Sequence, residues 1–273
     1  MFSRSKVLNT EIILIKQKEL LRELKKGVLI TPNLDHLIKI QKDREFYDCY
    51  RGKSLAPGGH DLPYPSITNQ GEPALWVVCD SVILYLCSKL TWRRRIPEAI
   101  PGSSFFTAFY LHHRNDPDCK IFLLGAREGV AATAMEKINQ RVGRQIVVGA
   151  HSPSYGFEKK PEEIEQIIDI INASGANVVL VGVGAPKQEK FIMTYRERMP
   201  GVDLWMALGA TIDFEAGYIK RAPKWVNRAG LEWAFRITQQ PKRMIKRYFG
   251  DDLVFFWCYL KQLLGIYKDP FGE

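Results

Sequence analysis

The stretch Asn177-Val-Val-Leu-Val-Gly-Val-Gly-Ala-Pro-Lys-Gln-Glu189 decides the fold. Its apolar half does not alternate with polar residues, and such a run predicts a strand that is buried on both faces of a sheet. A glycine turn follows at Gly184, and a helical pattern then covers Gln188–Arg198. A buried strand that leads through a turn into a helix is typical of a parallel sheet with helical connections.

Five further apolar runs lie along the chain, and helix-like segments separate most of them. The runs are Val28–Ile30, Ala74–Cys79, Lys120–Gly125, Gln145–Gly149 and Asp203–Leu208. Helical periodicity covers Glu11–Lys26, Glu128–Arg141 and Pro161–Ala173. The alternation predicts an α/β, Rossmann-like fold, in which helices cover both faces of a mostly parallel sheet.

The charge of the chain is concentrated near its C-terminal end. The net charge is +9, and residues 218–268 hold eleven basic against three acidic residues. We therefore expect a Rossmann-like domain over residues 1–217 and a basic, apolar helical appendage over residues 218–273. Residues 52–73 are rich in Gly, Pro, Ser and Asn and predict a loop inserted into the first domain.

Several classes of protein fit the composition poorly. The five cysteines are scattered without a CxxC pair, which argues against disulfides and zinc clusters and favours a reducing cytosol. The N-terminal residues lack the pattern of a signal peptide, and no run reaches the roughly 18 apolar residues that a membrane-spanning helix needs. The Asp116-Pro117-Asp118 stretch resembles a metal-binding DxD motif but precedes a strand, so we expect a turn there and no metal.

Polar residues follow the ends of the predicted strands. In an open parallel sheet, ligands bind beyond the carboxyl ends of the strands. The candidates at this edge are Thr31, Asn33, Asp80, His151, Gly184, Lys187, Gln188 and Asp213. A turn at Gly184 that runs into Lys187 and a helix N-terminus suits a diphosphate group.

Two of these signals have simpler structural explanations. Thr31 and Asn33 also suit the cap of a helix that begins near Leu34. Asp80 ends a strongly apolar run, where a carboxylate is costly unless it has a partner or a chemical task. Structure and function explain Asp80 about equally well.

Taken together, the chain resembles the WecG/TagA/CpsF glycosyltransferases, glycosyltransferase family 26, from about Val28 to Phe249. Five ordered segments carry the resemblance: Thr31-Pro-Asn-Leu-Asp-His-Leu37, Gly182-Val-Gly-Ala-Pro-Lys-Gln-Glu189, Ala216-Gly-Tyr-Ile-Lys-Arg-Ala-Pro-Lys-Trp225, Gly230-Leu-Glu-Trp-Ala-Phe-Arg236 and Pro241-Lys-Arg-Met-Ile-Lys-Arg-Tyr248.

The resemblance implies a reaction and a set of site residues. It implies inverting, metal-independent transfer of an N-acetylmannosamine-type sugar from UDP to a polyprenyl-diphosphate-linked acceptor, in teichoic acid or cell-surface polysaccharide synthesis, without a cofactor. The general base of the family maps to Asp80. Its pocket residues map to Thr31, Asn33 and Gln188.

Two departures from the family pattern leave a second possibility open. Glycines usually follow the aspartate, whereas this chain has Ser81-Val82-Ile83, and a customary arginine is replaced by Ala99. Arg95 and its two preceding arginines lie close by as candidates to replace it. A degenerate member that binds a UDP-sugar in a regulatory role is therefore the alternative function.

Inversion requires one displacement, in which Asp80 takes the proton of the acceptor hydroxyl. Without a metal, the protein must supply positive charge for the leaving diphosphate, and arginine suits this task because its planar fork binds phosphate oxygens in pairs. We expect this charge from the backbone near Gly184, from Lys187 and from the appendage, whose candidates are Arg221, Arg228 and Arg236.

The segment Leu253–Tyr267 is apolar and aromatic but too short to span a bilayer. With the basic residues upstream, it predicts peripheral association with an anionic membrane surface on the cytoplasmic side. A buried helix pair at the subunit interface of a homo-oligomer is the alternative.

Nucleic-acid binding through the basic appendage and a nucleotide-dependent oxidoreductase are rival functions. The first leaves the cleft residues without a role, and the second lacks a complete GxGxxG motif.

Overall fold

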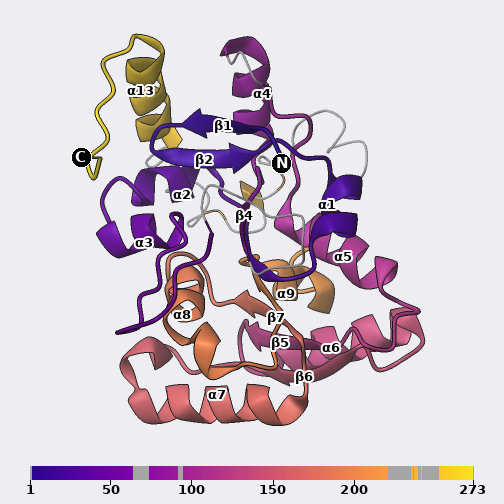
Figure 1. Ribbon diagram of the computed structural model, residues 1–273. Helices are drawn as coiled ribbons and strands as arrows, with labels where there is room; N and C mark the ends of the chain where they lie inside the picture. The colour runs from indigo at the N-terminus through magenta and orange to yellow at the C-terminus, as the bar shows by residue number, and fades with distance from the viewer. Residues whose placement is uncertain are drawn as a thin grey trace.

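A parallel sheet forms the centre of the computed structural model, which describes residues 2–63, 74–91, 95–220, 235, 237, 238, 241 and 252–272 (Figure 1). The strand order is β4-β3-β8-β7-β5-β6, and all pairings are parallel. The strands are β3 Gly27–Ile30, β4 Ala74–Val77, β5 Ile121–Gly125, β6 Val147–His151, β7 Val178–Gly182 and β8 Leu204–Ala207. All six predicted strands are present, and the Rossmann-like fold is confirmed.

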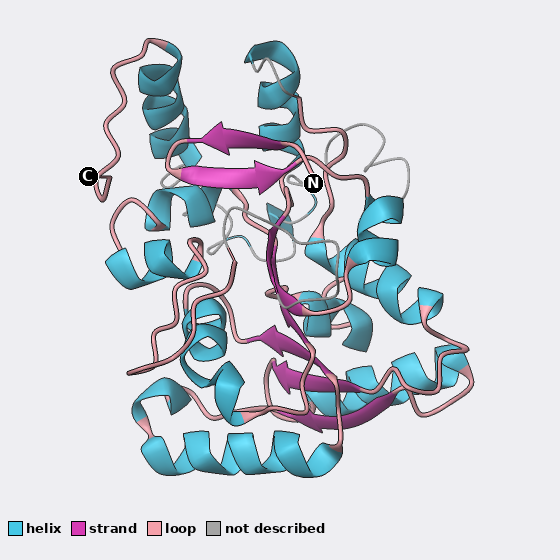
Figure 2. Cartoon of the chain, viewed as in Figure 1, coloured by secondary structure: helices cyan, strands magenta, loops and turns pink. Residues whose placement is uncertain are grey.

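Each face of the sheet contributes to a separate apolar core. Every residue of β7 is buried, with Val179 and Val181 in one core and Val178 and Leu180 in the other. Helices α2 Leu34–Lys39, α3 Arg44–Cys49, α7 Pro161–Ser174 and α8 Lys187–Tyr195 contribute to the first core, together with Leu84, Phe255 and Tyr259 from two helices described below. Four others contribute to the second core: α1 Gln17–Glu23, α5 Gly102–His112, α6 Val130–Val142 and α9 Thr211–Ala216. Figure 2 shows these helices around the strands.

The helical prediction for residues 11–26 was wrong at its start. A hairpin of β1 Arg4–Val7 and β2 Thr10–Ile13 occupies the N-terminal part, and only Gln17–Glu23 is helical. The consecutive β-branched residues Ile12 and Ile13 favour a strand, and both are buried in it.

The first part of the predicted loop insertion packs on the body of the protein. Residues 52–63 contain no helix or strand, yet Leu62 is buried and the Leu55 amide donates a hydrogen bond of 3.1 Å to the Met193 carbonyl at α8. Residues 64–73 of the predicted insertion lie outside the described residues.

Two further helices, α4 Val82–Thr91 and α13 Asp252–Leu263, project from the same end of the molecule, beyond the β1–β2 hairpin (Figure 1). Hydrogen bonds join the hairpin to α13. Gln262 of α13 accepts a hydrogen bond of 2.8 Å at Oε1 from the Leu8 amide, and its Nε2 donates to the Lys6 carbonyl. No helix in the described ranges has the length and apolarity needed to cross a membrane.

Candidate active site

A cavity of about 970 Å³ opens at the carboxyl ends of β3, β4, β7 and β8. The sheet order explains its position, because β3 pairs with both β4 and β8, and β8 pairs with β7. Seven residues that the sequence singled out line this one cavity: Thr31, Asn33, Asp80, Gly184, Lys187, Gln188 and Asp213. Segments up to 182 residues apart in the chain therefore line the same cavity.

Asp80 is held by the backbone on two sides. Its amide donates a hydrogen bond of 3.1 Å to the Pro32 carbonyl, which ties the end of β4 to the segment after β3. Its carboxylate Oδ1 accepts a hydrogen bond of 2.9 Å from the Gly102 amide, at the first residue of α5. The side chain is half-buried and lines the cavity. These contacts fix the orientation of a carboxylate at the cavity wall.

Thr31 and Asn33 follow β3 directly. Asn33 caps α2, because its Oδ1 accepts a hydrogen bond of 3.3 Å from the His36 amide, so the structural explanation holds for this residue. Thr31 is buried against α5: a Cβ atom at Gly102 would lie 3.1 Å from Thr31 Oγ1. A side chain at position 102 would therefore press on the wall of the cavity.

The Gln188 side chain connects two turns through hydrogen bonds. Its side chain is 1% exposed. Its Oε1 accepts hydrogen bonds from the Gly184 amide at 3.2 Å and from the Gly209 amide at 3.1 Å. These turns follow β7 and β8, and both line the cavity. The structure thus gives the Gln188 amide oxygen a role in shaping the wall, which sequence reasoning did not foresee.

Glu189 fixes the other end of the same amide. Its Oε1 accepts a hydrogen bond of 2.9 Å from Gln188 Nε2, which turns Gln188 Oε1 toward the two glycine amides. The Glu189 side chain is fully buried, and its Oε2 has no hydrogen-bond partner within the described part of the chain. Burial raises the pKa of this carboxyl from 4.5 to about 7.

Glu189 belongs to a buried group of titratable side chains that sequence reasoning missed. Burial raises the pKa of the Tyr50 hydroxyl well above its ordinary value, and the negative charge of Glu189 adds to this effect. Tyr50 OH lies 3.0 Å from Nδ1 of His36, which lines the cavity. The available signal was helical spacing, since Ile192 and Met193 lie three and four positions after Glu189 and are buried.

Lys187 begins α8 and forms an ion pair at the cavity. Its Nζ lies 2.6 Å from Glu158 Oε1 and 5.2 Å from the centre of the Tyr155 ring. The hydrogen bond from Lys187 is the main cause that lowers the pKa of Glu158. The Tyr155 side chain lines the cavity and is 97% exposed. Asp213 also lines the cavity, and its carbonyl accepts hydrogen bonds from the amides of Tyr218 and Ile219.

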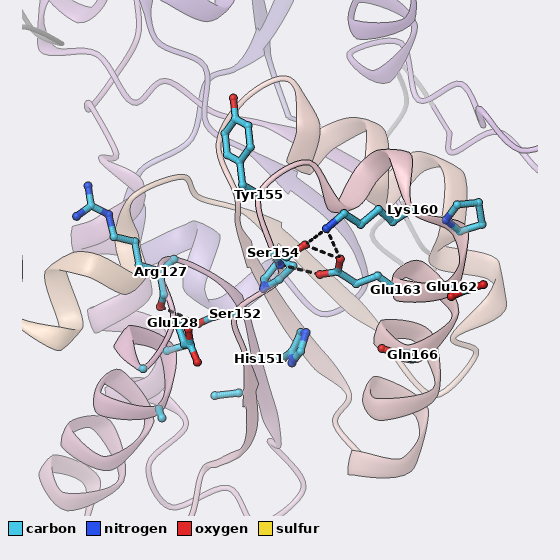
Figure 3. A pocket seen from close by; sticks show the side chains of 17 residues that line it. Arg127, Glu128, His151, Ser152, Ser154, Tyr155, Lys160, Glu162, Glu163 and Gln166 are labelled. Atoms are coloured by element: carbon cyan, nitrogen blue, oxygen red, sulfur yellow. Dashed lines mark hydrogen bonds and ion pairs between the residues drawn. The ribbon is translucent and has the colours of Figure 1, made fainter.

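A second cavity, of about 1180 Å³, lies beyond the ends of β5 and β6 (Figure 3). It shares Arg127, Ser154 and Tyr155 with the first cavity, so the two adjoin. Ser154 accepts a hydrogen bond of 2.6 Å from Lys160 Nζ and donates to the Glu163 carboxylate. His151, the last residue of β6, lines this second cavity and is absent from the lining of the Asp80 cavity.

Of the four predicted arginines, the structure describes Arg95. Arg95 is exposed and lines neither cavity. Arg221, Arg228 and Arg236 lie outside the described residues. Other residues of the C-terminal segment do reach the Asp80 cavity, namely Tyr218, Ile219 and Pro241.

Metal-ligating side chains do not cluster in the part of the chain that the structure describes: no three His, Cys, Asp or Glu residues there are grouped to hold an ion. The DxD-like stretch forms a turn before β5, in which Asp116 Oδ1 accepts a hydrogen bond of 3.1 Å from the Asp118 amide. That end of the strand is opposite the cavity edge.

The fold and the site define a Rossmann-like α/β protein, with a polar cavity where such proteins bind their ligands. Residues 65–269 match the model of the WecG/TagA/CpsF glycosyl transferase family, and this segment is more than half of the chain. The chain belongs to this family and is a glycosyltransferase of cell-surface polysaccharide synthesis, which acts on a sugar donor and an acceptor. Thr31 and Asn33 precede the matched segment and join the site through β3.

Proposed function

We propose that the protein transfers an N-acetylmannosamine-type sugar from UDP to a polyprenyl-diphosphate-linked acceptor sugar, with inversion and without a metal. The observation that carries this proposal is the Asp80 carboxylate, which lines the same cavity as the glycine turn and the N-terminus of α8. A base and a diphosphate-binding element are the two parts that a single displacement requires.

The displacement begins when the acceptor hydroxyl oxygen attacks the anomeric carbon of the donor. The new glycosidic bond forms while the bond between that carbon and the UDP oxygen breaks, and Asp80 accepts the hydroxyl proton. The bonding pair leaves with UDP. The hydrogen bond from the Gly102 amide to Asp80 holds the carboxylate in place for this step.

The leaving diphosphate gains negative charge, which the protein must stabilise. The positive end of α8, into which the turn at Gly184 leads, is suited to this charge, while the Gly184 and Gly209 amides themselves donate to Gln188 Oε1. Lys187 is the first residue of α8, and its ammonium group adds a positive charge that Glu158 partly neutralises. Gln188 and Glu189 hold the two turns in place, which keeps their backbone groups preorganised.

The size of the site supports a substrate pair. Small-molecule sites commonly measure about 300–1,000 Å³, so the Asp80 cavity suits a nucleotide sugar. The adjoining cavity extends the available space along Arg127 and Tyr155. We further propose that the basic and apolar C-terminal segment brings the enzyme to the cytoplasmic face of a membrane, where a polyprenyl acceptor resides.

A transfer assay with a panel of UDP-sugars and a short-chain polyprenyl-diphosphate-linked N-acetylglucosamine tests the proposal. We expect UDP release that depends on both substrates and persists with EDTA, and proton NMR should show an inverted anomeric configuration in the product. A product that retains the donor configuration, or transfer that EDTA abolishes, would contradict the mechanism.

A degenerate member that binds UDP-sugars without transferring them is the second candidate. Its support is Ser81, which stands where the family usually has glycine and caps α4: the Leu84 amide donates a hydrogen bond of 3.2 Å to Ser81 Oγ. This reading predicts UDP-sugar binding by calorimetry and no UDP release with any acceptor. Replacing Ser81 by glycine would then restore measurable transfer.

A further inference from the structure

Helix α4, which begins two residues after Asp80, exposes a stripe of apolar side chains. Val82, Leu86 and Leu90 recur every four residues and are 46%, 53% and 85% exposed. A spacing of four places them along one face of the helix. The opposite side of α4 contributes Leu84 to the core. Large apolar groups exposed in a row point to an interaction surface.

Helix α13 has the same character. Phe255 and Tyr259 are buried against the core, at 0% and 5% exposure, and they hold the helix on the body. The side chains Leu253, Phe256, Trp257, Leu260 and Leu264, spaced three or four residues apart or adjacent, are between 44% and 64% exposed. The helix therefore has one apolar face toward the core and a second one toward the outside.

The two helices meet. The hydroxyl groups of Tyr259 on α13 and Thr91 on α4 are hydrogen-bonded, and Tyr259 OH also donates to the Cys87 carbonyl at 3.5 Å. Both helices project from one end of the molecule, while α7 lies at the opposite end (Figure 1). The two apolar stripes thus belong to neighbouring helices at one end of the molecule.

The charges beside the apolar stripes identify the partner. Lys89 Nζ lies 4.8 Å from the centre of the Tyr85 ring, and Lys261 Nζ lies 5.2 Å from that of Trp257. Residues 82–91 contain no Asp or Glu, three arginines at positions 93–95 follow α4 in the sequence, and the acidic residues next to the α13 stripe, Asp251 and Asp252, are confined to the N-terminal end of that helix. Lysines beside aromatic rings, next to an apolar stripe, suit the headgroup layer of an anionic bilayer.

We propose that α4 and α13 together form one membrane-contact surface, so that the segment directly after Asp80 touches the lipid headgroups. The proposed function assigns membrane contact to the C-terminal segment alone, and this inference adds α4 to the contact surface. It rests on the proposed function in one respect: the surface would bring the cavity to a lipid-linked acceptor. Cations near an anionic surface and apolar side chains buried in the headgroup layer both strengthen binding to such a membrane.

Co-sedimentation of the full chain with vesicles tests the surface. The vesicles contain equal parts of phosphatidylglycerol and phosphatidylcholine, and vesicles of phosphatidylcholine alone provide the comparison. The L86E/L90E variant should lower the partition coefficient on the anionic vesicles at least about tenfold, since two charges replace apolar contacts. The matched control is I170E on α7, where Ile170 is 41% exposed, and it should bind as the unmodified chain does.

The outcomes separate the surface from its rivals. Equal vesicle binding by the chain and by L86E/L90E would overturn the proposal. So would light scattering that shows a dimer which L86E/L90E converts to a monomer while lipid binding persists, because the surface would then be a subunit interface. The single variant L90E, at a nearly fully exposed position, covers the case in which the double variant fails to fold. No sugar substrate enters this assay, so it is independent of the proposed transfer.

Discussion

Replacement of Glu189 by glutamine should change how the stability of the protein depends on pH. The pKa of Glu189 is about 7 in the folded protein because of burial, against 4.5 ordinarily. Below pH 4.5 the carboxyl is protonated in both the folded and the unfolded chain, so it adds no pH dependence. As the pH rises from 4.5 to 7, the unfolded chain releases the proton and the folded chain retains it, so this group makes the folded state progressively less stable.

The size of the effect follows from the two pKa values. Each pH unit between them corresponds to about 1.4 kcal/mol, so the full cost above pH 7 is roughly 3 kcal/mol. Part of that cost is already present at pH 5, which leaves about 2 to 3 kcal/mol between pH 5 and pH 8. Glutamine keeps an acceptor for Gln188 Nε2 and cannot ionise, so E189Q should lose this dependence.

Urea unfolding of the unmodified chain and of E189Q, at several pH values across this window, measures the difference directly. The free-energy advantage of E189Q over the unmodified chain should grow by about 2 to 3 kcal/mol from pH 5 to pH 8. The E162Q variant, at an exposed position of α7, is the control for glutamate substitution on a helix. Parallel stability curves for E189Q and the unmodified chain would refute the burial of an ionisable Glu189.

Two further substitutions test the contacts around the site and beside it. Gln188→Leu leaves the amides of Gly184 and Gly209 without their shared acceptor. It should lower the free energy of unfolding by about 2 to 4 kcal/mol and weaken UDP binding in calorimetry. Unchanged UDP affinity would show that the shape of the turns does not depend on the hydrogen bonds to Gln188. Glu215→Ala removes the acceptor of Thr107 Oγ1 at 2.5 Å, Tyr110 OH at 2.9 Å and Arg141 Nη1 at 3.1 Å. Because this network lies outside the cavity lining, urea unfolding should show a loss of about 3 kcal/mol with little change in UDP affinity, and the reverse pattern would be a contradiction.

The fold was predictable because the sheet is buried on both faces. Each strand of such a sheet is an uninterrupted apolar run, and that signal is local, as in Val178–Gly182. The edge that carries polar residues followed from the parallel topology, which placed Thr31, Asp80 and Gln188 at one cavity. The β1–β2 hairpin was not predicted, because Leu14, Leu21 and Leu24 among lysines and glutamates gave a helical period to a segment whose Ile12 and Ile13 favour a strand.

The details of the site depend on contacts that no local pattern encodes. The amide oxygen of Gln188 accepts hydrogen bonds from turns that follow two different strands, and the turn at Gly209 lies 21 residues further along the chain. His151 ends a strand at the predicted edge, yet β6 is the outermost strand and carries it to the adjoining cavity. Glu189 gives no sign of burial in its own residue type, since glutamate is seldom buried without an ionic partner.

Transfer by D80N tests the central claim most directly. Asparagine keeps an oxygen that can accept the hydrogen bond from the Gly102 amide, but it cannot take the proton of the acceptor hydroxyl. We predict that kcat for UDP release with the lipid-linked acceptor falls by about 10²- to 10⁴-fold in D80N, with UDP affinity preserved. D118N, in the turn before β5, should retain full activity. A D80N enzyme that transfers sugar at the rate of the unmodified chain would contradict the assignment of Asp80 as the base.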